Sequence, residues 1–319
     1  MKKIILTLVL SISILGTTFA QENQQDNSIN LYTFFVNVVN EQFRFPLIGF
    51  INIAKGSHNS PQIGFINWNQ QKISPLQLGF VNTAGDDMTG LQMGFINTAV
   101  KSVNGVQLGF VNTAVGEEIK GLQLGFINTT VNRFNGTQIA FVNTTKQLNG
   151  MQFGFINYAD TIKSGIPVGL LSIVRKGGYK AIELGVSEIS PFNISFKIGV
   201  EKFYTSFIVA YNPFRDGIRE QIILGGGFGT IIPLSKNLYL NPELTSYKEM
   251  NESSQNYASI IPYLGWNITS NLSIVVGPSA VWAYNNKSVE APFYKITEYS
   301  INDENKLYFG ARMGLRFRW

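Results

Sequence analysis

One six-residue phrase, Gln-aliphatic-Gly-Phe-Ile/Val-Asn, recurs about every fifteen residues through the first half of the chain. It stands at positions 92–97 and again at 107–112. Its phenylalanine recurs at positions 50, 65, 80, 95, 110, 126, 141 and 155. Because each unit of a repeat protein contacts mainly its neighbours, such a period decides the fold of the region that carries it. Residues 34–175 are therefore predicted to form one β-repeat region.

Each repeat predicts a short β-strand followed by a turn. In the unit at 121–130, alternate residues separate into two faces, and one face is strongly apolar, with Leu122, Leu124 and Phe126. The opposite face of this strand of about seven residues carries Gln123, Gly125 and Ile127. Asn-Gly pairs at 104–105, 135–136 and 149–150 mark turns, because both residue types accept a positive φ.

Two arrangements of the repeats fit this pattern. In a solenoid, each unit is one coil, and the asparagines at 52, 67, 82, 97, 112, 128, 143 and 157 form a stacked amide ladder. In a meander or a wide barrel, each unit is one antiparallel strand, which suits the alternation of Val and Ile after the phenylalanine. Both arrangements remain open. The residues that define the repeat structurally are Gly94, Phe95, Asn97, Gly109, Phe110, Asn112, Gly125, Phe126 and Asn128.

The beginning of the chain predicts export. Residues 1–20 match a signal peptide, with Lys2 and Lys3 before an apolar stretch at 4–16 and small residues at 18–20 before the expected cleavage. A polar linker at 21–33 follows. The chain has no cysteine, which excludes disulfides, thiolate metal sites and a lipid-modified cysteine. Without the signal, 23 basic and 20 acidic residues remain, so nucleic acid is not an expected partner.

The second half, 180–319, predicts an antiparallel transmembrane β-barrel of about eight strands. Strands are expected near 181–188, 193–200, 203–212, 220–232, 237–247, 257–268, 271–283 and 306–319. The last strand places Leu315, Phe317 and Trp319 on an apolar face and Arg312, Arg316 and Arg318 on a polar face, as in a barrel with a polar lumen. Short and long connections alternate, which is typical of outer-membrane barrels.

Two parts of the sequence resemble known families. The alternating end that closes on Trp319 resembles the C-terminal signal by which the barrel assembly machinery recognises outer-membrane barrels, although most such signals end in Phe. The resemblance implies that Leu315, Phe317 and Trp319 carry this signal. Segments 227–229 and 233–238 are similar to outer-membrane proteins of Bacteroidetes-type bacteria. Residues 48–172 are similar to a bacterial surface-repeat family with Gly-x-Gln-aliphatic-Gly-apolar-apolar-Asn units, a family that implies no activity.

No catalytic, cofactor-binding or metal site is predicted. His58 is the only histidine, so a histidine-based metal site cannot form, and the residue is interpreted as a solvated loop residue. No cofactor is expected. The arginines on the polar face of the last strand are expected to pair with carboxylates such as Glu243.

These features together predict a non-enzymatic outer-membrane, cell-surface protein whose repeats act as a scaffold or a binding surface. The expected partners are outer-membrane lipid, the barrel assembly machinery and an unidentified surface or periplasmic ligand. Transport is not expected, because an eight-stranded barrel is filled by its own side chains. One alternative is a single wide barrel in which the repeats are membrane strands of a pore. A second alternative is an outer-membrane hydrolase. Specificity, if present, would lie in the variable loops between one phrase and the next.

Overall fold

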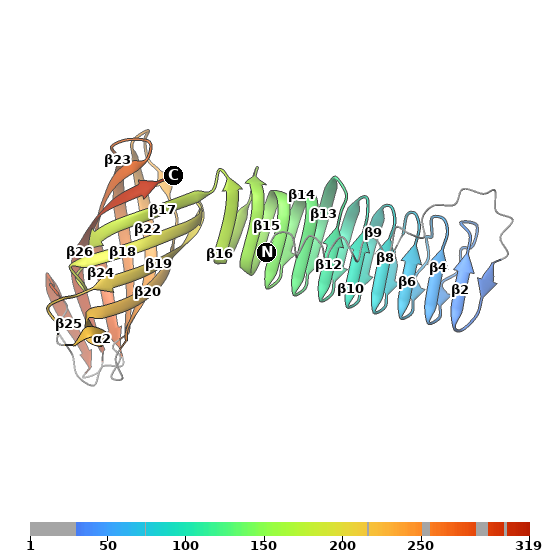
Figure 1. Ribbon diagram of the computed structural model, residues 1–319, viewed down its shortest axis with the longest axis horizontal. Coiled ribbons are helices and arrows are strands. Elements are labelled where there is room, and N and C mark those ends of the chain that lie inside the picture. The colour runs from blue at the N-terminus through green and yellow to red at the C-terminus, as the bar shows by residue number, and fades with distance from the viewer. Residues whose placement is uncertain (1–29, 74, 216, 251–255, 285–292, 303–304) are drawn as a thin grey trace. The chain divides into compact units, whose positions relative to one another are not determined.

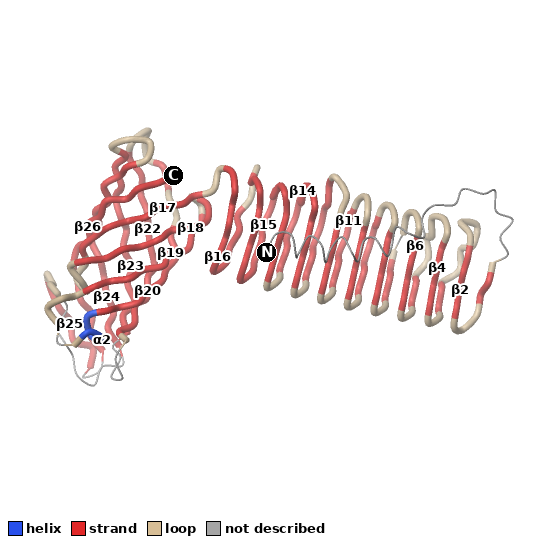
Figure 2. Tube along the Cα trace, in the orientation of Figure 1, coloured by secondary structure: helices blue, strands red, loops and turns tan. Residues whose placement is uncertain are grey.

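The structure is a computed structural model that describes residues 30–319 except 74, 216, 251–255, 285–292 and 303–304. It contains a stacked β-solenoid and a closed antiparallel β-barrel (Figure 1). Strands dominate both parts (Figure 2), so the predicted all-β class is confirmed. Within the described residues, no helix is long and apolar enough to cross a bilayer. The predicted signal peptide and most of the predicted linker at 21–33 lie outside the described residues.

Each coil of the solenoid contributes two short strands, which stack on the corresponding strands of the neighbouring coils. One ladder contains β2 (Val36–Val39), β4 (Ile51–Ala54), β6 (Ile66–Asn69), β8 (Val81–Ala84), β10 (Ile96–Ala99) and β12 (Val111–Ala114). The other contains β3 (Leu47–Ile48), β5 (Gln62–Ile63), β7 (Leu76–Leu78), β9 (Met88–Met93), β11 (Val103–Leu108) and β13 (Glu118–Leu124). Longer strands complete the array: β14 (Ile127–Ile139), β15 (Val142–Ile162) and β16 (Ile166–Lys176). At the first coil, β1 (Leu31–Tyr32) pairs antiparallel with β2.

Within each ladder, neighbouring strands run parallel and pair at equivalent positions of successive coils. Asn97 is opposite Asn112, and Gln92 is opposite Gln107. This register settles the choice that the sequence leaves open. The repeats form a solenoid, because a meander or a wide barrel would need antiparallel pairs. The alternation of Val and Ile after the phenylalanine, which favoured antiparallel strands, therefore does not reflect the strand direction.

Two buried amide ladders run through the interior of the solenoid. The asparagine ladder joins successive side chains from Asn37 to Asn143, with Nδ2 to Oδ1 distances of 2.7–3.1 Å. The glutamine ladder joins Gln62 to Gln152 in the same way at 2.6–2.8 Å. All these amides are at most 1% exposed. Within each ladder, a buried amide is therefore satisfied by its copy in a neighbouring coil. The exceptions are Gln62 Nε2 and Gln152 Oε1, at the two ends of the glutamine ladder, which have no partner among the described residues.

The predicted seven-residue strand with Leu122, Leu124 and Phe126 on one face is wrong. Strand β13 ends at Leu124 and β14 begins at Ile127, with a bend between them. This corner breaks the alternation, so Gln123 and Asn128 both point inward although they are five positions apart. Leu124 and Phe126 are 43% and 44% exposed. The amides thus occupy the interior and many large apolar side chains lie outside.

In most coils, an apolar residue from the opposite end completes the interior. Its position is occupied in successive coils by Ile73, Met88, Val103, Ile119, Phe134 and Leu148, all at most 3% exposed. A small residue of the first ladder, such as Ala99 or Ala114, packs beside the asparagine. In the described coils, these residues supply the large apolar side chains of the interior.

The barrel consists of eight antiparallel strands: β17 (Tyr179–Val186), β18 (Phe192–Val200), β19 (Phe203–Tyr211), β20 (Ile222–Gly229), β22 (Leu238–Glu249), β23 (Asn256–Asn267), β24 (Leu272–Tyr284) and β26 (Asn305–Arg318). Pairing of β17 with β26 closes the sheet. Two short strands lie beside it, β21 (Ile232–Pro233) and β25 (Thr297–Asn302), and one four-residue helix, α2 (Ile218–Gln221), precedes β20. The predicted strand number and fold class are confirmed.

The amide ladder predicts a local stability effect for Asn97. Its Nδ2 donates to the Leu108 carbonyl oxygen at 2.8 Å, and its Oδ1 accepts from Asn82 at 2.9 Å. We expect Asn97→Ala to lower the free energy of unfolding by about 2–4 kcal/mol, since each buried group left without a partner costs about 1–3 kcal/mol. Thr98→Ala, on the outer face, should change it by less than about 0.5 kcal/mol. Urea unfolding of the full-length protein, followed by circular dichroism, measures both; equal effects would contradict the ladder.

Candidate functional site

The interior of the barrel holds equal numbers of positive and negative charges. The buried charged side chains in the described part of the barrel are Glu183, Glu188, Glu243, Glu249, Lys197, Arg215, Arg312 and Arg316. A buried charge is strongly unfavourable unless an opposite charge and hydrogen bonds compensate it. Four carboxylates against four cations meet the first of these conditions.

The first group of charges surrounds Arg316 of β26. Its guanidinium donates to Glu183 Oε2 and Asn241 Oδ1, both at 2.6 Å, and to Glu243 Oε1 at 3.2 Å. Lys197 of β18 is buried, and its Nζ donates to Glu243 Oε1 at 2.6 Å. The same ammonium lies 3.6 Å from Glu183 Oε1. Two cations and two carboxylates neutralise one another here, and the predicted pairing of an arginine with Glu243 is confirmed.

Two further groups occupy other levels of the barrel. Arg312 donates to Glu188 Oε1 at 2.8 Å and to the Tyr247 hydroxyl at 2.7 Å. Arg215, from the connection between β19 and β20, forms a buried ion pair with Glu249. The sequence did not identify Glu188, Arg215 or Glu249 as members of these groups. Glu188 and Arg215 lie in connections, where no alternation marks the inward side, and Glu249 is the last residue of β22, which the predicted strand at 237–247 did not include.

These side chains fill the barrel. The cavity between the first two groups of charges has a volume of about 20 Å³ and is lined by Glu183, Lys197, Tyr247 and Arg312 among others. Such a volume holds about one water molecule. A carboxylate whose oxygens are already bound to cations is poorly placed to act as a base toward an external substrate. The geometry therefore favours a structural role for the interior charges.

The outer face of the barrel is apolar. Exposed large side chains point outward from every one of its eight strands: Leu184, Ile194, Val209, Leu224, Leu244, Ile260, Leu264, Trp266, Val276, Trp282, Phe309, Met313, Leu315, Phe317 and Trp319. Leu315, Phe317 and Trp319, the predicted assembly signal, lie on this face and are 52–54% exposed. The Trp319 ring lies 6.3 Å from the Phe196 ring and 6.4 Å from the Phe317 ring, measured between centroids.

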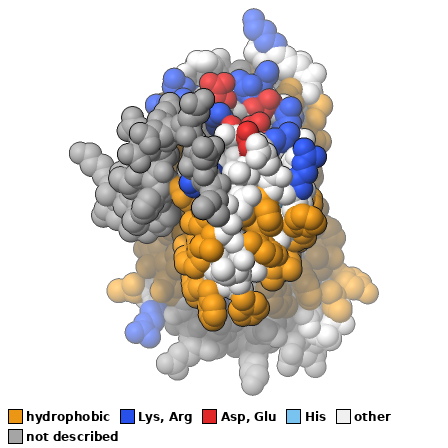
Figure 3. Space-filling model, turned by 90° about the vertical axis from the view of Figure 1, so that its right-hand side faces the viewer, with side chains coloured by type: hydrophobic (Ala, Val, Ile, Leu, Met, Phe, Trp, Pro, Cys, Tyr) orange, Lys and Arg blue, Asp and Glu red, His pale blue; other side chains and the backbone are white. Residues whose placement is uncertain are grey.

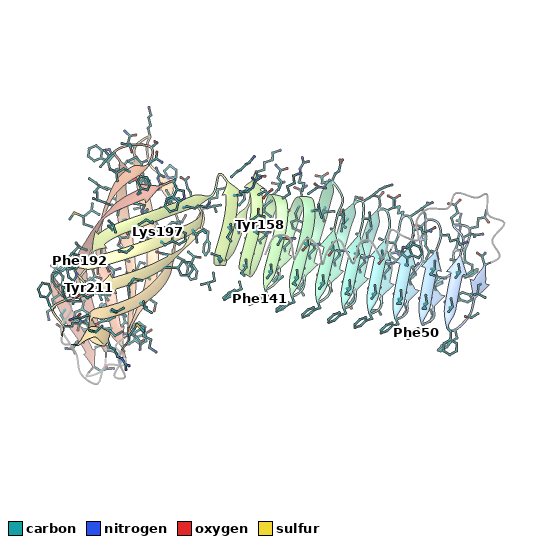
Figure 4. All side chains as sticks on the ribbon, viewed as in Figure 1. Phe50, Phe141, Tyr158, Phe192, Lys197 and Tyr211 are labelled. Carbon is teal, nitrogen blue, oxygen red and sulfur yellow. The ribbon has the colours of Figure 1, made fainter. Side chains whose placement is uncertain are left out.

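The phenylalanines of the repeat form one continuous outer edge of the solenoid, which we call the aromatic ridge. It comprises Phe50, Phe65, Phe80, Phe95, Phe110, Phe126 and Phe141. Successive ring centroids lie 4.9–5.1 Å apart, and the rings are parallel to within 5°. Each side chain is 44–55% exposed. Figure 4 shows Phe50 and Phe141, near the two ends of the ridge, on the same edge.

The repeat glycines keep successive coils in contact at this corner. A Cβ at Gly94, Gly109 or Gly125 would lie 2.0–2.4 Å from the carbonyl oxygen of the equivalent glycine one coil earlier. A larger side chain would push the coils apart, and the equivalent corner at Ala140 holds only a methyl group. The predicted repeat asparagines Asn97, Asn112 and Asn128 are fully buried members of the amide ladder. The structure thus separates the phrase into inner amides, a close backbone contact and an outer aromatic ring.

The opposite edge of the solenoid is polar and carries the variable loops. An open groove of about 660 Å³ lies there between two successive loops, beside Lys101, Glu117, Glu118 and Lys120. Lys101 forms an ion pair with Asp86 at 2.5 Å, and this pairing raises the pKa of the lysine. The acidic residues of these loops are therefore partly compensated. Among the described residues, no group of three or more His, Cys, Asp or Glu side chains could hold a metal ion.

His58 is not a solvated loop residue, and that interpretation is wrong. Its side chain is fully buried, because its backbone is bridged to Ile73 and it takes the interior position that Ile73 and Met88 occupy in the next coils. Neither ring nitrogen has a hydrogen-bond partner among the described residues. Burial lowers the pKa of the imidazole, against a smaller opposing effect of the nearby Phe43 backbone. The sequence signal was available in the alignment of His58 with the apolar residue near the end of each loop.

Comparison with known proteins gives no match: neither a family model, nor a curated protein, nor a solved structure is similar to this chain.

Burial of His58 predicts a pH-dependent stability of the first coils. Because the folded state disfavours the charged imidazole, the unfolded chain binds a proton more readily below its ordinary pKa of about 6.5. The free energy of unfolding should therefore fall as the pH drops below that value, by at most about 1.4 kcal/mol per pH unit. We expect His58→Met, which introduces the residue type of position 88, to remove this slope. Urea unfolding of both proteins between pH 7 and pH 5 tests it; parallel pH profiles would contradict the burial.

The barrel charges predict that removing one cation is costly. Arg316→Met would leave Glu183 and Glu243 buried with only Lys197, so we expect the free energy of unfolding in detergent to fall by about 3–5 kcal/mol. The control is Lys295→Ala, which removes an exposed pair with Glu298 and should cost less than about 1 kcal/mol. A small effect of Arg316→Met would mean that water reaches the interior charges.

Proposed function

We propose that this chain is a non-enzymatic outer-membrane protein in which the barrel is the membrane anchor and the solenoid is a scaffold or binding surface. The observation that carries the proposal is the inverted polarity of the barrel. Arg316 is completely buried, whereas its neighbours Leu315 and Phe317 are each 52% exposed. A barrel in water would place these side chains the other way round.

The reason is the solvent that each face requires. A charge inside a closed barrel is stabilised by opposite charges there, while an apolar outer band is stabilised by lipid and opposed by water. Backbone groups of a closed sheet are all paired, so none would be left without a partner in the hydrocarbon region. The longest barrel strands, β22, β23, β24 and β26, have 12 to 14 residues, and about 9–11 tilted residues cross a bilayer.

The lengths of the barrel connections support an orientation of the barrel in the membrane. At one end the connections are short, with two residues between β18 and β19 and four between β23 and β24. At the other end β19 and β20 are separated by a segment that contains α2, and the connection before β26 contains β25. Outer-membrane barrels have short periplasmic turns and longer external loops. We therefore place the end with α2 and β25 outside the cell.

The proposal gives the barrel no transport role. Its interior is occupied by paired charges and by tyrosines such as Tyr204, Tyr257 and Tyr308, each at most 1% exposed. The solenoid contributes regular surfaces, and its described residues include no group of three or more side chains that could hold a metal ion. A scaffold with repeated outer ranks suits recognition of an extended partner better than chemistry on a small substrate.

Labelling of introduced cysteines tests the topology, because the chain has no native cysteine. We expect Ser300→Cys, on the exposed strand β25, to react with a membrane-impermeant maleimide on whole cells. Ser270→Cys, in the tight turn at the opposite barrel end, is the matched control and should react only after permeabilisation. Absence of labelling at position 300 on intact cells, or labelling at position 270 instead, would contradict the proposed placement. Steady ion conductance in planar bilayers would contradict the filled barrel.

A further inference from the structure

We infer that the aromatic ridge binds the acyl chains of a lipid bilayer, so that the solenoid lies along a membrane surface by this edge. The inference rests on the proposed function, which brings the solenoid to a membrane. It adds a second lipid contact, separate from the barrel, and assigns a partner to the most regular surface of the repeats.

The apolar area of the ridge is larger than an isolated soluble domain normally exposes. A phenylalanine side chain has about 200 Å² of surface, so seven rings that are nearly half exposed present on the order of 600 Å². Aliphatic residues flank every ring and add to this area, among them Ile63, Leu78, Met93, Leu124 and Ile139 at 37–43% exposure. Contiguous apolar patches above a few hundred Å² mark interaction sites.

The surface around the ridge is uncharged in every coil. Seven segments contain the phrase and the residues beside it, 62–69, 77–84, 92–99, 107–114, 123–130, 138–145 and 152–159, and none has an Asp, Glu, Lys, Arg or His. Charged side chains gather at the opposite edge, as Figure 3 shows from the N-terminal end of the solenoid. An uncharged strip matches hydrocarbon and offers no group that would select an acidic or basic partner.

The ring stacking excludes recognition by ring faces. Phe80, Phe95 and Phe110 lie parallel with 4.9 Å between successive ring centroids, a gap too narrow for a sugar ring to enter between two rings. Sugars and cations bind to the faces of aromatic rings. Only ring edges are available along the ridge, and ring edges offer hydrophobic burial without directional preference. This property suits a fluid partner.

The shape of the ridge favours lipid over a second copy of the chain. Phe95 projects from the corner between β9 and β10, and apolar residues lie on both sides of it, with Met93 on one sheet and Ile96 on the other. Two such convex edges could cover only part of each other. Acyl chains can close around both sides of a corner, as they do around an amphipathic element at a bilayer surface.

Site-specific fluorescence in bilayers tests the inference. Single cysteines at Phe95 on the ridge, Lys101 on the loop edge and Leu264 on the outer barrel face are labelled with bimane in the full-length protein. The proteins are reconstituted in phosphatidylcholine nanodiscs with and without dibrominated acyl chains, which quench on contact. We expect roughly twofold or greater quenching at positions 95 and 264, since a surface-bound element reaches about 5–10 Å into the headgroup and acyl boundary. Position 101 should be unaffected.

The three positions separate failure of this inference from failure of the proposed function. Quenching at position 264 without quenching at 95 would overturn lipid binding by the ridge and leave the barrel anchor intact. No quenching at position 264 would overturn the anchor itself. A blue-shifted probe at position 95 without quenching would show that another protein surface, such as a second copy, covers the ridge. Met93→Cys repeats the measurement beside the ridge in a protein that keeps the Phe95 ring, so the ring stack stays intact.

Discussion

The hydrogen bond between identical amides of successive coils is the interaction on which the repeat half depends. An asparagine buried alone would leave several polar atoms unsatisfied, at a cost of about 1–3 kcal/mol each. In a parallel, in-register stack, each Nδ2 finds the Oδ1 of the next coil, as Asn97 finds Asn112 at 2.9 Å. The ladder therefore favours the same residue at the same place in successive coils; at its end, Asn157 donates to the Ser172 hydroxyl instead, at 3.3 Å. This condition accounts for the uniformity of the phrase better than any shared ligand does. Close backbone contact between adjacent coils also favours glycine at the corner, where Ala140 is the largest residue in the coils that carry the full phrase.

Because the amides fill the interior of the solenoid, other side chains of the repeat must lie on its surface. The two sheets are close together, and the interior has room for one asparagine, one glutamine and one larger apolar residue per coil. The phenylalanine and its aliphatic neighbours are consequently displaced to the surface, where their rings stack on one another. A surface ladder of this kind recovers part of the burial through ring contacts. The rest of its apolar area remains exposed.

The period, the strands and the eight-stranded barrel follow from the sequence because each depends on local alternation. The solenoid could not be chosen over a meander, since a fifteen-residue period has the same appearance in both and only strand direction separates them. The apolar and polar faces of the repeat strand did not show which of them lies inside: Gln123 is buried, whereas Leu124 beside it is 43% exposed. His58 was misread because burial of an imidazole depends on a neighbouring coil. In the barrel, Arg316 with Glu243 followed from the alternating last strand, whereas Glu188 and Arg215 lie in connections, where no alternation marks the inward side.

Both halves of the chain share one inversion of ordinary protein architecture, with polar groups inside and apolar groups outside. In the barrel this inversion extends around the whole circumference, as Leu184, Leu244 and Leu315 on different strands illustrate. In the solenoid it is limited to one edge, because the other edge carries ion pairs such as Lys101 with Asp86. The difference has a direct physical meaning. A surface that is apolar all round is stable when lipid encloses it, whereas a body with one apolar edge and one charged edge is stable at a boundary between lipid and water. On the two proposals made above, the barrel spans a bilayer and the solenoid contacts lipid by its aromatic ridge.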